Sequence, residues 1–243
     1  MRASFPFIKK GVVASIPMIV GGMPFGLLFG SLVAANDLPI WLALIMSSMV
    51  FAGSAQFVAI GLIALGAPIW VIVLTTFIVN LRHLLYSADM VKYVKHLPLK
   101  TRLIMGFGLI DETYAAVRPL YEQDGFKEHG HKAYFGSFFS FYLMWNVTTL
   151  VGVVAGELIP GMSDWGLEFA MVATFIGIIS PYLTSFPYFF AFAGAGVTSV
   201  VLNGLPNQLG LIVAAIVGVM LGALGERREN KLKRIEEVQN EFI

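Results

Sequence analysis

The stretch Asn80-Leu81-Arg82-His83 decides how the rest of the chain is interpreted, because it places polar and charged side chains inside an apolar segment. Residues 69–79 before it carry no charge, and the apolar run continues after it. An isolated charge at the centre of a bilayer costs roughly 2.5–3.5 kcal/mol on insertion scales, so charged residues inside membrane segments are usually functional. The stretch therefore predicts a polar site within a membrane protein.

The composition places the chain among the helical membrane proteins. Hydrophobic residues make up 57% of the 243 residues and charged residues 13%, whereas soluble domains carry about 25% charged residues. This deficit, together with long apolar runs, predicts an all-α polytopic fold of about six to eight transmembrane helices. The net charge of +1 gives no reason to expect nucleic acid as a partner. The lack of cysteine excludes thiol catalysis and thiolate metal sites, and no cofactor is expected.

Several apolar segments contain residues that break helices. The first, residues 11–35, is expected to be interrupted around Pro24, because proline removes a backbone hydrogen bond. Residues 40–65 have small residues at their centre, and residues 169–202 are too long for one span. Prolines within residues 169–202 predict two short helices there, so the fold is expected to contain broken or re-entrant segments. No internal repeat is visible, but an inverted repeat of the transporter kind stays open.

Basic residues predict which loops face the cytoplasm. They are concentrated before the first span, in residues 91–102 and at Arg227-Arg228, so both termini are expected inside. Eight full crossings would place residues 91–102 outside. We therefore expect residues 40–65 to form a hairpin bent at Gly53 with both ends outside, and residues 103–119 a hairpin or partial helix with both ends inside.

Six full crossings then remain, within a single membrane domain of residues 1–225. Residues 226–243 are polar but carry an apolar stripe near helical spacing, which predicts a cytoplasmic amphipathic helix.

The centre of residues 40–65 is a candidate binding site. If the helix breaks at Gly53-Ser54, the free amides of the second half can bind a carboxylate. Gln56 adds an amide one turn further on. The alternative is that these small residues only allow neighbouring helices to pack closely.

Arg82 and His83 have a candidate partner in the acidic pair Asp111-Glu112. Adjacent residues point about 100° apart on a helix, so one acid could pair with Arg82 or take a proton while the other faces water. His83 is the intramembrane group able to titrate near neutral pH. In the alternative reading, Arg82 extends to the lipid headgroups and both acids are solvated.

Four blocks occur in a distinctive order: residues 22–26 (GMPFG), 51–57 (FAGSAQF), 80–87 (NLRHLLYS) and 111–115 (DETYA). Together they resemble the AzlC family, which includes the larger subunit of a bacterial branched-chain amino acid exporter. The resemblance implies a secondary exporter of valine, leucine and isoleucine in the inner membrane, with methionine as a further candidate. It also implies a small hydrophobic partner of the AzlD-like (YgaH-like) type. An enzyme is not expected, because no nucleophile accompanies the possible acid/base pair of His83 and Asp111.

A zwitterionic substrate with an apolar side chain needs three kinds of contact. Its carboxylate could bind the amides of Gly53 and Ser54, or Arg82. Acceptors for its ammonium are Gln56, Asn80 and Asp111. Its side chain needs an apolar pocket, for which the candidates are Phe25, Phe51 and Phe57.

Export against a gradient needs an energy source, and the candidates for a coupling proton or a gate are Arg82, His83, Asp111 and Glu112. A membrane channel and a non-transporting assembly subunit remain the competing functions. Saturable, stereoselective flux separates an exporter from a channel, and an assembly subunit has no need of central polar groups.

Overall fold

The computed structural model describes residues 5–123, 126–158, 176, 180, 183–205 and 209–241. This part of the chain is helical and contains no strand. The chain divides into two compact units. The first comprises Met1–Ala64 and Val79–Met171, and the second Leu65–Ile78 and Val172–Ile243.

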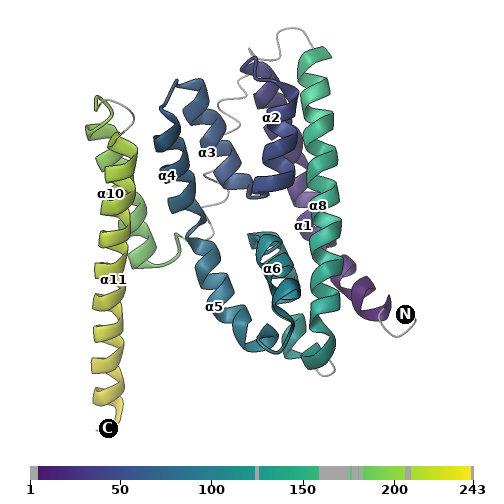
Figure 1. Ribbon diagram of the computed structural model, residues 1–243. Coiled ribbons are helices and arrows are strands. Elements are labelled where there is room, and N and C mark those ends of the chain that lie inside the picture. The colour runs from purple at the N-terminus through teal and green to yellow at the C-terminus, as the bar shows by residue number, and fades with distance from the viewer. Residues whose placement is uncertain are drawn as a thin grey trace. The chain divides into compact units, whose positions relative to one another are not determined.

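The first unit is built on two long helices, α1 (Phe5–Ala35) and α8 (Phe126–Leu158), which pack along each other (Figure 1). Glycines allow this close approach. A Cβ atom on Gly30 would lie 2.1 Å from the Thr149 carbonyl oxygen, and one on Gly152 would lie 2.1 Å from the Leu27 carbonyl oxygen. Small residues at a helix interface are the usual basis of close packing in membranes.

The expected interruption of the first span around Pro24 is wrong. Helix α1 continues through both Pro17 and Pro24. Pro24 is exposed, while Gly22 and Gly26, on either side of it, are buried against α8. The packing of these glycines against α8 stabilises the helical conformation where Pro24 removes a backbone hydrogen bond.

A broken hairpin follows, consisting of α2 (Ile40–Ile45), the π-helical turn η2 (Met46–Val50) and α3 (Gly53–Ala64). The break lies at Phe51 and Ala52, directly before the predicted position at Gly53. Phe51 has a φ of 44°, in the left-handed region that non-glycine residues rarely adopt. The first amides of α3 are thereby released inside the unit.

The other half of the unit contains a second break. Helix α5 (Arg82–Val94) runs down to a turn, and α6 (Leu99–Phe107) returns beside it (Figure 1). The chain breaks at residues 108–110 and continues as α7 (Asp111–Val117) and the short turn η3 (Leu120–Glu122). The helical part of residues 103–119 is therefore broken, as a hairpin requires.

The second unit contains most of α4 (Ile69–Asn80), with α10 (Phe186–Val201) and α11 (Leu209–Glu241). Helix α10 begins at the predicted break beside Pro187, whereas the short helix expected before it falls largely outside the described residues. Helix α11 continues without interruption past residue 225, so the polar C-terminal segment extends the last apolar helix.

Within the described residues, three helical stretches are long and apolar enough to cross a membrane: Pro6–Ala35, Ile69–Val94, which comprises α4 and α5, and Glu128–Leu158. Shorter apolar helices are Ile40–Val50, Gly53–Ala64 and Phe186–Val201. Large apolar side chains are widely exposed on these helices, including Leu84 and Leu85 directly after the Arg82-His83 pair. These features confirm the all-α membrane class.

Candidate functional site

Arg82 joins the starts of three helices in the first unit. It is the first residue of α5, and its Nη1 lies 2.6 Å from Oδ2 of Asp111, the first residue of α7. Its Nη2 donates a hydrogen bond of 2.5 Å to Oγ of Ser54, in the first turn of α3. The structure therefore pairs Arg82 with one acid of the Asp111-Glu112 pair and brings both to the broken hairpin. We call Ser54, Arg82 and Asp111 the arginine junction.

The second carboxylate oxygen of Asp111 is also occupied. The Tyr86 hydroxyl donates a hydrogen bond of 2.5 Å to Oδ1. The Arg82 and Asp111 side chains are 27% and 31% exposed, so the ion pair is shielded but remains reachable. Glu112, the second residue of α7, is half-buried and forms no ion pair among the described residues.

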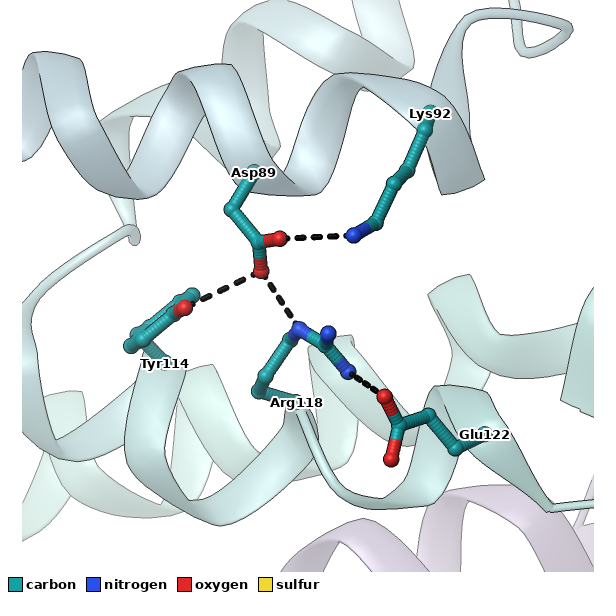
Figure 2. A network of polar contacts seen from close by, with 5 residues as sticks. All are labelled: Asp89, Lys92, Tyr114, Arg118 and Glu122. Carbon is teal, nitrogen blue, oxygen red and sulfur yellow. Dashed lines mark hydrogen bonds and ion pairs between the residues drawn. The ribbon is translucent and has the colours of Figure 1, made fainter. Parts of the chain in front are cut away.

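A second polar network lies further along the same two helices (Figure 2). Asp89 on α5 accepts hydrogen bonds from Lys92 at 2.8 Å, from the Tyr114 hydroxyl at 3.0 Å and from Nε of Arg118. Arg118 also donates to Glu122 at 2.8 Å. Its hydrogen bonds to Glu122 and Asp89 raise the pKa of Arg118, which keeps it a cation.

The two networks show that α5 and α7 lie parallel in a fixed register. The pairs Arg82–Asp111 and Asp89–Arg118 have the same offset in sequence and opposite polarity. The Tyr86 and Tyr114 rings stack between them, with centroids 4.6 Å apart and planes at 14°. The sequence prediction did not include Asp89, although its spacing of seven residues from Arg82 matches the spacing of Arg118 from Asp111.

Gln56 is fully buried, and both ends of its amide are hydrogen-bonded within the protein. Its Nε2 donates to Ser47 Oγ at 3.2 Å, and its Oε1 accepts from Trp145 Nε1 at 3.0 Å. Ser47 in turn bonds Thr149 at 2.8 Å. This chain of hydrogen bonds ties η2 and α3 to α8, so the arrangement gives Gln56 a structural task beside its predicted role in binding.

The predicted aromatic pocket is filled by the core in this structure. Phe51 and Phe57 are each 2% exposed. Phe51 contacts the rings of Phe107, Phe138, Phe141 and Tyr142. A separate apolar cavity of about 190 Å³ lies between α5, α6 and α8, and its lining includes Met90, Val94, Met105, Leu109 and Tyr134. Phe25 is half-buried on α1, and Gly53 lies against the Trp145 ring, where a Cβ atom would come within 3.0 Å of Cη2.

Three neighbouring side chains at the α4–α5 boundary have buried atoms without a hydrogen-bond partner among the described residues. They are Oδ1 of Asn80, Nε of Arg82 and Nε2 of His83. Buried polar atoms are nearly always paired in folded proteins, so such a cluster indicates strain, bound water or a ligand site.

Comparison with known proteins gives consistent matches. The model of the AzlC protein family matches residues 17–159. The branched-chain amino acid transport protein AzlC of Bacillus subtilis is 29% identical over 224 residues, which cover 90% of this chain and 83% of that protein. The inner membrane protein YgaZ of Escherichia coli is 25% identical over 174 residues, which cover 70% and 71%. An uncharacterized membrane protein of Helicobacter pylori is 28% identical over 217 residues, which cover 87% and 92%. No solved structure matches significantly.

The matched range contains the broken hairpin, the arginine junction and all of α8. The match confirms the resemblance predicted from the four sequence blocks. Since it covers more than half of the sequence and the relatives align over most of its length, the chain belongs to the AzlC family of membrane proteins.

Proposed function

We propose that this protein is a secondary-active exporter of branched-chain amino acids, with valine, leucine and isoleucine as substrates and methionine as a further candidate. The observation that carries the proposal is the arginine junction, in which one cation holds together the starts of helices α3, α5 and α7. Broken helices with polar groups at the break are the usual binding sites of secondary transporters. The similarity to the branched-chain amino acid transport protein of Bacillus subtilis supports this substrate class.

In this proposal the Arg82–Asp111 pair is the cytoplasmic gate. A substrate carboxylate binds the same guanidinium as Asp111 and thereby weakens the Arg82–Asp111 pair. Separation of the ion pair then releases the start of α7 from the start of α5 and opens a path. His83 and Glu112 are the candidate proton carriers, since they lie next to the pair and are not engaged in it.

The setting of this cycle is a bacterial inner membrane with both termini in the cytoplasm. A small hydrophobic AzlD-like subunit completes the exporter. The competing functions are a channel, which would conduct without saturation, and an assembly subunit, which would not move substrate at all.

Valine efflux from preloaded cells tests the proposal, with this chain expressed alone and together with the small subunit. Arg82→Ala and Asp111→Ala are expected to reduce efflux to the level of cells without the chain, while membrane insertion is retained. The exposed Arg227→Ala and Glu157→Gln serve as matched controls and should leave efflux unchanged. Normal efflux from both junction variants would refute the gate.

A further inference from the structure

The unpartnered atoms at residues 80–83 form a chemically specific set. Asn80 Oδ1 is an acceptor, Arg82 Nε is a donor, and His83 Nε2 can be a donor. All three are buried at the turn where α4 ends and α5 begins. Leaving a buried polar group unsatisfied costs about 1–3 kcal/mol, so three within four residues call for a partner that supplies both a donor and acceptors.

The structure also narrows the choice among the acceptors for a substrate ammonium. Gln56 is the weaker candidate in this arrangement, because it is fully buried and its Oε1 already accepts a hydrogen bond from Trp145. Asp111 is committed to Arg82 through Oδ2 and to Tyr86 through Oδ1. Asn80 Oδ1 is the acceptor among the three that is buried without a partner in the described part of the chain.

The structure limits the choice of donors for a substrate carboxylate in the same way. Nη1 and Nη2 of Arg82 are held by Asp111 and Ser54, whereas Nε has no partner among the residues that the structure describes. His83 Nε2, one residue further along, likewise has no partner in the described part of the chain. A guanidinium held at its tip by two protein partners presents its Nε in a fixed position, which suits recognition of one carboxylate oxygen.

We propose that Asn80, Arg82 and His83 form the head-group site for a zwitterionic α-amino acid, a refinement that rests on the proposed export function. Asn80 Oδ1 accepts a hydrogen bond from the substrate ammonium, while Arg82 Nε and His83 Nε2 donate to its carboxylate. The three atoms are shielded from solvent, so the site is closed in this structure and is exposed during the transport cycle. Arg82 then serves both the gate and the site, which couples head-group binding to the Arg82–Asp111 pair.

The site requires both charged groups on the ligand, and this can be tested on the unmodified protein. The assay is competition against radiolabelled leucine bound to the purified chain in nanodiscs. L-Leucine should compete at least roughly tenfold better than 3-methylbutan-1-amine, which lacks the carboxylate, and than 4-methylpentanoate, which lacks the ammonium. Equal competition by either analogue would overturn the proposal.

Two variants locate the site. Asn80→Ala and His83→Ala should each raise the KM for valine efflux by roughly tenfold or more, with a smaller effect on the maximal rate, because each removes a contact to a charged group. Asn36→Ala and His96→Ala are matched controls. The Asn36 amide bonds Leu32 within its own helix end, and His96 is exposed. Wild-type KM in both site variants would show that water alone occupies these atoms. Failure of the unmodified protein to export valine would instead refute the proposed function.

Discussion

Gln56 shows how a single side chain can join two helices in an apolar interior. Its amide links the Trp145 indole to the Ser47 hydroxyl, and no part of the side chain is exposed. Removing it leaves the buried Trp145 Nε1 without its acceptor, while the Ser47 hydroxyl keeps its hydrogen bond to Thr149.

Gln56→Ala is therefore expected to lower the free energy of unfolding by about 1–3 kcal/mol, because the buried Trp145 indole N–H is left unpaired. The loss should be non-additive with Trp145→Phe, because both changes break the same hydrogen bond. Thermal unfolding of the purified protein in detergent measures both. Strict additivity would mean that the Gln56–Trp145 bond does not stabilise the fold.

Single residues were predictable where their chemistry is costly in a membrane. Ser54, Arg82 and Asp111 stand out in the sequence because polar groups there need partners, and the structure brings these three together. The role of Asp89 could not be predicted in the same way, since it is one acid in a helix of mixed polar and apolar residues. Its importance depends on Tyr114 and Arg118, which approach only in the fold.

At the scale of elements, α5 and α7 are aligned by two ion pairs of opposite polarity. A shift of one helix by a turn would bring neither pair together. The Asp89 network therefore fixes the register in which Asp111 meets Arg82 (Figure 2).

Asp89→Ala and Arg118→Ala should each reduce both stability and valine efflux, with a coupling energy of about 0.5–3 kcal/mol in the double variant. Lys92→Ala is the matched control, because its side chain is 53% exposed and surface ion pairs contribute about 0–1 kcal/mol. A double-variant cycle in thermal unfolding gives the coupling energy. Zero coupling between Asp89 and Arg118 would contradict a register held by this pair.

The α1–α8 interface depends on glycine. Gly30→Ala would place a Cβ atom 2.1 Å from the Thr149 carbonyl oxygen, so the backbones must separate, at an expected loss of about 1–3 kcal/mol. Gly21→Ala is the matched control on the same helix, where an added Cβ atom meets nothing within 4 Å. Thermal unfolding in detergent compares the two. Equal stability of the variants would show that α1 and α8 are not held by this close approach.

Helix breaks were predictable only in part. The break near Gly53 and the start of α10 at Pro187 follow from local residue chemistry. The continuity of α1 through Pro24 does not, since it depends on packing against α8, more than a hundred residues away. The turn at Leu81 between α4 and α5 was likewise not predictable, because it contains no glycine or proline.

At the scale of the whole molecule, the membrane orientation remains a prediction from charge. The chain has no cysteine, so single-cysteine variants can be labelled against a clean background. Lys95→Cys should be labelled only after the cytoplasmic face becomes accessible, whereas Asn36→Cys should react with an impermeant maleimide from outside. Labelling of residue 95 from outside would rule out the re-entrant arrangement of residues 40–65.

The class of protein and its family could be predicted from composition and from four short blocks, because both depend on local stretches of sequence. The spatial arrangement of these blocks could not be predicted. The sequence does not show that residues 54, 82 and 111 meet at one guanidinium, or that the aromatic side chains at 51 and 57 fill the core.

Transport by the purified protein tests the account most directly. Proteoliposomes carrying the chain together with the small hydrophobic subunit would be preloaded with labelled L-valine, and efflux followed into valine-free buffer. We predict saturable efflux that discriminates against D-valine and is lost in Arg82→Ala. Efflux no faster than from protein-free liposomes would contradict the proposed function, and efflux unchanged in Arg82→Ala would contradict the arginine junction as its site.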